Sequence, residues 1–339
     1  MKSNNIAYID FAKSFAIVSI VLYHICLNLP MLPMWFKQIS WFGGTGIHLF
    51  FFISGFGISM SKWAGFKNFL NRRFLKIYLP YFIFIMILIP VNTIWVIYPQ
   101  EGRNVYLSHI LLYKMFVPEY INSLGGHFWF LSTIFQFYLC YPLLRIFKLH
   151  VSDHLFLLAS FLISIGYMLI VSYYGFNSRV ATSCFLLYLW EFSLGIYLAE
   201  KFKATGYKFW DLKLWFVVLI AITGIGLMAA VSIQTSYSLL GHMLNDFPAF
   251  IGYFAISILA YRLLKNKISL LYQFFVANGK FGYSLYLVHI LVLDIFILIL
   301  SRLHHELDLF SAMLVLPFMY LASVLFYQLS QKAIQALQK

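Results

Sequence analysis

The sequence has little charge, few acidic residues and almost no cysteine. Only 10% of its 339 residues are charged, whereas a soluble globular domain carries about 25%. Aspartate and glutamate number 11, against 24 lysines and arginines, and there are 3 cysteines. The low charge excludes an ordinary soluble domain. The cysteines lie in apolar runs without metal-ligand spacing, so we interpret them as small packing residues and expect no metal.

The excess of basic residues does not indicate a nucleic-acid partner. The net charge is +13, but the basic residues lie in short runs between apolar segments and form no basic domain. Low-complexity linkers and a convincing internal repeat are also missing. We therefore expect a single integral membrane domain over residues 1–339.

Long apolar runs dominate the chain. About 20 apolar residues in a helix cross the hydrocarbon core of a bilayer. The pattern predicts an all-α, polytopic membrane protein with ten transmembrane helices. The run at 43–61 is rich in glycine and serine and should pack closely against its neighbours. The predicted spans are 8–30, 44–61, 77–98, 127–147, 155–174, 180–200, 214–233, 245–262, 281–301 and 309–330.

Lysine and arginine are distributed unevenly between the segments that connect the spans. If both termini are cytoplasmic, all but five of the 24 basic residues fall on the cytoplasmic side; the five outer ones are Lys37, Arg103, Lys114, Arg179 and Arg302. Because positively charged connecting segments stay in the cytoplasm, this distribution predicts cytoplasmic termini. An even number of spans agrees with that orientation.

The first span carries three ionisable residues, Asp10, Lys13 and His24. Such groups are costly within a membrane and mark candidate functional sites. Lys13 and His24 fall on nearly the same helix face, roughly 16 Å apart along the axis. Asp10 precedes Lys13 by one turn and is placed to orient it, or is a surface charge at the inner boundary. His24, deep in the span, is our candidate base for a hydroxyl or nucleophile for an acyl group.

Five basic residues crowd together after the second span: Lys62, Lys67, Arg72, Arg73 and Lys76. Such a group can anchor the chain to anionic membrane lipids. Guanidinium groups also bind phosphates through paired hydrogen bonds. We therefore place phosphate binding on Arg72, Arg73 and Lys76, with lipid anchoring as the simpler interpretation.

Other polar residues lie within or beside later spans. Glu191, in the middle of the sixth span, should be protonated or paired with a cation, and is a candidate for lining the reaction cavity. His127 and Trp129 lie at the outer end of the fourth span, where an aromatic face can stack on a sugar or simply belong to the interfacial belt. His289, midway along the ninth span, is either functional or a buried histidine bonded to a carbonyl group.

Five motifs in sequence order resemble the acyltransferase-3 family of integral membrane acyltransferases. The first helix of that family carries a basic residue, then ten other residues, then a histidine. Later helices carry aromatic and basic motifs. The matching stretches here are YIDFAKSFAIVSIVLYH, GTGIHLFFFISGF, NRRFLKIYLPYF, GHFWFLSTIFQFYLCYPLL and GKFGYSLYLVH.

The resemblance implies O-acylation, usually O-acetylation, of a cell-surface glycan or lipid-linked sugar. It implies acetyl-coenzyme A (acetyl-CoA), or another acyl-CoA, as the cytoplasmic donor, and a bacterial inner membrane as the location. His24 matches the histidine regarded as catalytic. Lys13 replaces a common arginine, while Arg73 and Lys76 match an Arg-x-x-Arg motif. Tyr286 and His289 match the late motif, in which Gly282 replaces a common serine.

Two other function classes fit a ten-span protein with intramembrane charge. A secondary transporter or glycan flippase would also have a basic cytoplasmic face, although paired repeats and discontinuous helices are not evident. A haem-binding electron-transfer protein would use histidines as axial ligands and would be coloured. The acceptor sugar, its hydroxyl, the acyl chain and the oligomeric state cannot be inferred from these apolar spans.

Overall fold

The computed structural model describes residues 6–98, 102–235 and 238–338, and over these ranges all regular secondary structure is helical. Ten helical segments are long and apolar enough to cross a membrane. This confirms the all-α class and the predicted number of spans, and the protein is a multi-pass membrane protein. The segments are Ala7–Leu27, Met34–Met60, Phe66–Trp95, Gly126–His150, Asp153–Tyr173, Arg179–Thr205, Leu214–Ser232, Leu239–Lys267, Ser269–Arg302 and Leu309–Leu337.

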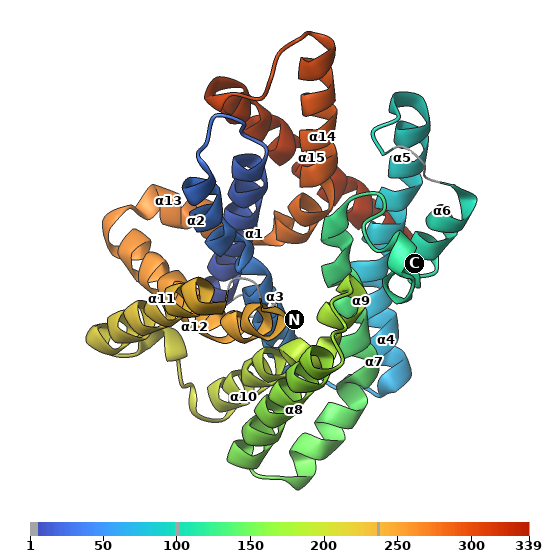
Figure 1. The fold of residues 1–339 in the computed structure, drawn as a ribbon. Helices are drawn as coiled ribbons and strands as arrows, with labels where there is room; N and C mark the ends of the chain where they lie inside the picture. Colours follow the sequence, from blue (N-terminus) through green and yellow to red (C-terminus); the bar gives the residue numbers. More distant parts are fainter. Residues whose placement is uncertain (1–5, 99–101, 236–237, 339) are drawn as a thin grey trace. The chain divides into compact units, whose positions relative to one another are not determined.

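Several spans contain more than one helical piece. The α-helices in chain order, labelled as in Figure 1, are α1 (Ala7–Leu27), α2 (Met34–Gly44), α3 (Gly46–Met60), α4 (Phe66–Arg73), α5 (Leu79–Trp95), α6 (Arg103–Ile110), α7 (Trp129–His150), α8 (Asp153–Tyr173), α9 (Arg179–Thr182), α10 (Leu189–Thr205), α11 (Leu214–Thr235), α12 (Leu239–Lys267), α13 (Ser269–Asn278), α14 (Gly282–Arg302) and α15 (Leu309–Leu337).

The chain divides into two compact units. Unit 1 contains the described residues of 1–20, 41–62 and 140–280, and unit 2 contains those of 21–40, 63–139 and 281–339. The expectation of a single domain over 1–339 stays a prediction.

Unit 1 contains an aromatic core. Tyr8 at the start of α1 is fully buried, and its ring stacks on Trp210 at 5.3 Å between centroids. The edges of Phe209 and Tyr261 approach the same ring at 5.3 and 5.4 Å. The Tyr8 hydroxyl shares a hydrogen bond of 2.8 Å with Ser257, so the one polar atom of this ring is also satisfied.

Glycines allow two helix pairs of unit 1 to approach closely. A Cβ atom added to Gly55 of α3 would lie 2.0 Å from the Phe192 carbonyl oxygen of α10, and one added to Gly195 would lie 2.1 Å from that of Phe52. Gly224 and Gly252 do the same for α11 and α12, which lie side by side in Figure 1. The predicted close packing of the second apolar run is therefore confirmed.

In unit 2, helices α5, α14 and α15 pack against one another. Phe84 of α5 is buried between the ring of Phe128, 5.9 Å away, and the edge of Phe326 of α15, 5.8 Å away. The Tyr283 hydroxyl of α14 donates to the Ile77 carbonyl at 2.7 Å. These contacts fix α14, which carries His289, against the helix that follows the basic residues.

A π-helical turn, Phe74–Tyr78, joins α4 to α5. Its last hydrogen bond runs from the Leu79 amide to the Phe74 carbonyl, five residues earlier. Pro80 explains this turn, because it has no N–H to donate to the Lys76 carbonyl and its ring would clash there in a regular α-helix. The turn separates Arg72 and Arg73 from the rest of the span.

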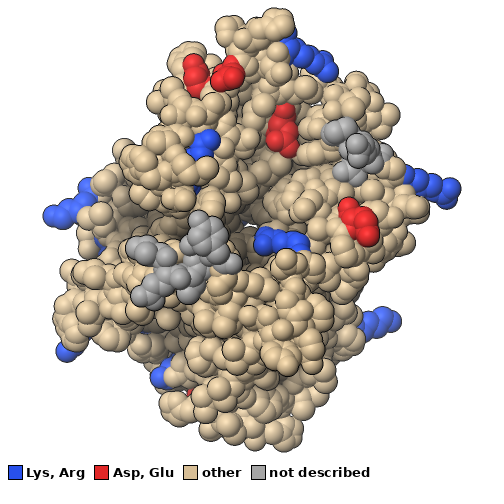
Figure 2. Space-filling view, viewed as in Figure 1, with Lys and Arg blue, Asp and Glu red and all other residues tan. Residues whose placement is uncertain are grey.

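Uncharged side chains cover most of the surface. Figure 2 shows one face on which lysine, arginine, aspartate and glutamate are few and scattered. The exposed large side chains include many apolar ones, among them Leu143, Ile222 and Leu270. Helices that face lipid carry such residues because polar and charged side chains are costly in hydrocarbon.

Candidate functional site

Unit 2 contains a cluster of three histidines and a tyrosine, here called the histidine cluster. It comprises His24 of α1, His127 in the turn before α7, and Tyr286 and His289 of α14. The rings of His24 and His289 lie 5.1 Å apart, and those of His127 and His289 lie 5.4 Å apart. The Tyr286 hydroxyl donates to the His127 carbonyl at 2.6 Å. Four predicted site residues from three distant segments are therefore brought together.

The contact between His24 and His289 fixes the tautomers of both rings. Nδ1 of His289 lies 3.0 Å from the Leu285 carbonyl and 2.8 Å from that of Tyr286, so this nitrogen carries the proton and donates. Nε2 of neutral His289 is then an acceptor, and it lies 3.3 Å from Nδ1 of His24. His24 therefore donates through Nδ1, and its lone pair resides on Nε2.

Local structure holds each histidine in place. The Asn28 side chain donates to the His24 carbonyl at 2.9 Å, which satisfies a backbone acceptor at the end of α1. His127 follows two residues in left-handed backbone conformations, Leu124 (φ 51°) and Gly125 (φ 104°). A Cβ atom on Gly125 would lie 3.0 Å from the His127 ring, so glycine leaves room for the imidazole there.

His127 has unused hydrogen-bonding capacity. Its side chain is buried, and neither ring nitrogen has a hydrogen-bond partner among the described residues. A buried polar group without a partner is disfavoured. The ring therefore has a donor and an acceptor to offer to a bound molecule.

The three basic residues predicted to bind the donor also belong to unit 2. Arg72 and Arg73 lie in the last turn of α4, and the exposed Lys76 lies in the π-helical turn. The Arg73 guanidinium lies 5.5 Å from the ring centroids of both Phe69 and Tyr138. These aromatic faces hold the planar group in a defined orientation.

Lys13 and Asp10 belong to unit 1. The Lys13 ammonium lies 3.0 Å from the Asp10 carboxylate, so the predicted pairing one helical turn apart is present. The backbone of Asp10 also meets Gly279, where an added Cβ atom would lie 2.4 Å from the Asp10 carbonyl oxygen.

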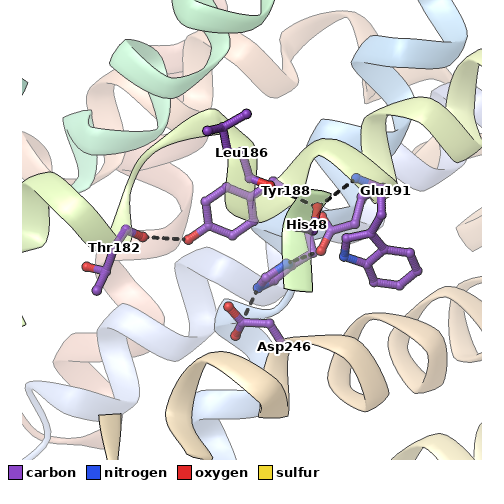
Figure 3. A network of polar contacts seen from close by, with 8 residues as sticks. His48, Thr182, Leu186, Tyr188, Glu191 and Asp246 are labelled. Carbon is purple, nitrogen blue, oxygen red and sulfur yellow. Dashed lines mark hydrogen bonds and ion pairs between the residues drawn. The ribbon is translucent and has the colours of Figure 1, made fainter. Parts of the chain in front are cut away.

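The two remaining predicted residues are Glu191 and Trp129. Glu191, in the first turn of α10 in unit 1, is fully buried and pairs with His48 of α3 at 2.8 Å (Figure 3). Trp129 begins α7 and is half-buried, and its carbonyl accepts a hydrogen bond from Thr133 at 3.1 Å.

The prediction from sequence missed a buried polar network before α7. Tyr81 lies 3.0 Å from Nδ1 of His109, whose Nε2 lies 2.9 Å from the Ser123 hydroxyl. Lys114 is fully buried, donates to the Ser123 carbonyl at 3.2 Å and lies 5.4 Å from the centroid of the Phe128 ring. Burial, with the positive charge of Lys114, holds the pKa of His109 well below its usual value.

It also missed ionisable residues inside the spans: His48, Asp246 and Asp294. Asp294 of α14 accepts a hydrogen bond from the Tyr98 hydroxyl at 2.6 Å. His48 and Asp294 interrupt apolar runs, and Asp246 lies at the start of one; an ionisable residue in such a run marks a candidate site in a membrane protein. The signal was therefore present in the sequence.

Comparison with known proteins gives one match. The sequence profile of a family described as an acyltransferase domain (Acyl_transf_3) matches residues 6–328. Neither the curated proteins nor the solved structures gave a match. The profile covers all five motifs and all the predicted site residues.

Proposed function

The chain belongs to the acyltransferase-3 family of membrane proteins, and on that premise we propose that it moves an acetyl group from cytoplasmic acetyl-CoA to a hydroxyl of a cell-surface glycan or lipid-linked sugar. We place it in the inner membrane of a bacterium. The observation that carries the proposal is the contact between His289 and His24, because it leaves a basic lone pair on Nε2 of His24.

The proposed reaction assigns one role to each ring of the pair. The acceptor hydroxyl gives its proton to Nε2 of His24 as its oxygen attacks the thioester carbonyl carbon. The carbon–sulfur bond then breaks, and the proton passes from His24 to the leaving thiolate, so atoms and charge balance. His289 holds the orientation of His24 and accepts the hydrogen bond that stabilises the imidazolium. Attack by Nε2 itself on the thioester, through an acetyl-histidine, is the covalent variant of this route.

Donor binding is assigned to Arg72, Arg73 and Lys76. Coenzyme A carries several phosphate oxygens, which bind most strongly to guanidinium and ammonium groups. The cation–π contacts of Arg73 with two aromatic rings support this role, since an oriented guanidinium loses less freedom when it binds. The pair formed by Lys13 and Asp10 is assigned to positioning at the cytoplasmic end of α1.

Acceptor binding is assigned to His127, Tyr286 and Trp129. The two buried nitrogens of His127, which have no hydrogen-bond partner in the described part of the chain, suit sugar hydroxyls, which both donate and accept hydrogen bonds. Tyr286 holds the His127 backbone in place.

The test is consumption of radiolabelled acetyl-CoA by the purified protein in nanodiscs. We expect the wild type to consume the donor and His24→Ala to lose at least 100-fold in kcat, the lower range for removal of a general base. Arg73→Ala should instead mainly raise KM for the donor.

The matched control is His242→Ala, which removes an exposed histidine of α12. It should keep wild-type turnover, and all variants should keep the thermal unfolding temperature of the folded protein. Full turnover by a folded His24→Ala variant would contradict the proposed role. A wild type that neither binds nor consumes acyl-CoA while glycan still crosses the membrane would favour a flippase.

A further inference from the structure

A second polar cluster lies within unit 1. Figure 3 shows His48 of α3 between two carboxylates, Glu191 of α10 and Asp246 of α12. Nδ1 of His48 lies 2.8 Å from a Glu191 oxygen, and Nε2 lies 3.6 Å from an Asp246 oxygen. The side chains of His48 and Glu191 are 9% and 0% exposed, whereas that of Asp246 is 31% exposed.

The packing around this cluster is built from defined contacts. The Tyr188 ring stacks on Phe51 at 4.5 Å and presents an edge to His48 at 5.4 Å. The Tyr188 hydroxyl donates to the Thr182 carbonyl at 3.0 Å, as drawn in Figure 3. The imidazole therefore has a fixed position between its two carboxylates.

The geometry requires that His48, Glu191 and Asp246 together hold one proton more than a neutral histidine with two carboxylates would. A neutral imidazole donates through one nitrogen and accepts through the other. With Glu191 and Asp246 both ionised, one lone pair of His48 would point at a negative oxygen. That arrangement is repulsive, and strongly so where little water screens it.

Burial decides which group holds the added proton. The second oxygen of Glu191 is buried and has no hydrogen-bond partner among the described residues, and an ionised carboxylate is strongly disfavoured in such a place. Asp246 is partly exposed, so water stabilises its charge, and the positive charge of Arg179 of α9 also favours the ionised form. We propose that Glu191 binds a proton and donates it to Nδ1 of His48, while the Nε2–H of His48 points to an ionised Asp246.

The partly exposed Asp246 is the group through which the site exchanges its proton. The exchange starts with both carboxylates ionised and with the proton of neutral His48 on Nδ1. The Asp246 carboxylate takes a proton from the solvent and passes it to Nε2 of His48, while the proton on Nδ1 moves to Glu191. One proton is gained, Asp246 regains its negative charge and the imidazole stays neutral. The ligand of this site is thus a proton, and its binding joins α3, α10 and α12. The inference is independent of the proposed acyl transfer.

Infrared spectroscopy tests the proposal directly. The carbonyl stretch of a protonated carboxyl group is separate from that of a carboxylate. We expect the purified wild type in nanodiscs to show this absorption at neutral pH and Glu191→Gln to lose it. A glutamine amide keeps the shape of the side chain and can donate to His48, so the variant should fold. Glu119→Gln, which changes an exposed acid, is the matched control and should keep the absorption.

The pH dependence of thermal unfolding gives a second readout. Because the folded protein holds the proton more tightly than the unfolded chain, the stabilisation should be present at lower pH and disappear as the pH rises through the value at which Glu191 ionises. Glu191→Gln should not show this decrease. Equal spectra and equal pH dependence for the wild type and Glu191→Gln would overturn the proposal. So would a wild type without any protonated-carboxyl absorption, even if the variant failed to fold.

Discussion

His289 illustrates how a residue can act through another one. It is fully buried, and its two carbonyl partners determine which of its nitrogens accepts from His24. We predict that His289→Leu lowers kcat by about tenfold or more with little change in KM, because the proposed base His24 loses its orienting acceptor. His289→Gln should restore part of kcat, since its amide oxygen can accept the same hydrogen bond. Steady-state kinetics at several pH values measures both effects.

The pH profile separates positioning from simple packing. If His289 orients His24, His289→Leu should shift the pH at which kcat falls on the acid side, and His289→Gln should return it towards the wild type. An unshifted profile, with equal losses in the two variants, would count against a positioning role.

We predict that acid destabilises the buried polar network around His109, before α7. Its pKa lies well below the usual value, chiefly through burial and also through the charge of Lys114. The unfolded chain binds a proton at this residue near pH 6.5, whereas the folded chain does not. Stability from His109 is therefore present above about pH 6.5 and lost as the pH falls below it.

Thermal unfolding of the wild type and His109→Gln measures this effect. The wild type should lose more stability than the variant as the pH is lowered from about 7 to about 5, through the pKa of an exposed histidine. The exposed residue His242 provides the control, because His242→Gln should follow the wild-type curve. Parallel curves for all three proteins would show that His109 is not the acid-sensitive group.

At the scale of elements, the π-helical turn sets the direction of the basic residues. It inserts one residue into the helical path between Arg73 and α5. Pro80→Ala would supply the missing N–H, so we expect a regular α-helix and a rotation of Arg72 and Arg73 by about 100° relative to α5. KM for acetyl-CoA should rise severalfold at unchanged kcat. Pro90→Ala, in the same helix, should leave KM unchanged.

The contact between α3 and α10 depends on single glycines. Gly55→Ala would place a methyl group 2.0 Å from a carbonyl oxygen of α10, so the helices must separate. We expect a loss of about 1–3 kcal/mol of stability, the range for overpacking in a core. Gly57 is the matched control in the same helix, because a Cβ atom there meets nothing within 4 Å. Unfolding temperatures measure the difference, and equal values for Gly55→Ala and Gly57→Ala would refute it.

The elements themselves were largely predictable, and their ends were not. The run predicted at 214–233 is α11, Leu214–Thr235, whereas the run predicted at 245–262 is the longer α12, Leu239–Lys267. Hydropathy detects the part of a helix that faces lipid. Polar turns at either end, such as those with His242 and Lys265, continue the backbone hydrogen bonding but carry no apolar signal.

At the scale of the whole molecule, the contacts of the sites depend on pairs far apart in sequence. His24 and His289 are 265 residues apart, and His48 and Glu191 are 143 apart. The sequence marked His24, His289 and Glu191 as intramembrane polar residues, but a run of apolar residues does not determine which other run it packs against. Their partners follow from glycine contacts and ring packing that only the folded chain reveals.

The orientation of the whole chain is the last prediction. Lys201 and Lys203 lie near the end of α10, and Lys208 and Lys213 lie in the connection to α11. The connection between α14 and α15 contains Glu306 and Asp308 and no lysine. The positive-inside rule therefore places the first connection and both termini in the cytoplasm. A single cysteine at an exposed position of each connection, Lys208→Cys or Glu306→Cys, tests this in a background where Cys26, Cys140 and Cys184 are replaced by alanine.

A thiol reagent that cannot cross membranes should label Glu306→Cys in intact cells and Lys208→Cys only after permeabilisation. The opposite pattern would reverse the orientation. It would also move Arg72, Arg73 and Lys76 to the outer side, because they lie in the first part of the third span and share a side with the connection at Lys208. A cytoplasmic acyl-CoA could not reach them there, so the sidedness of two cysteines also tests the assignment of the donor site.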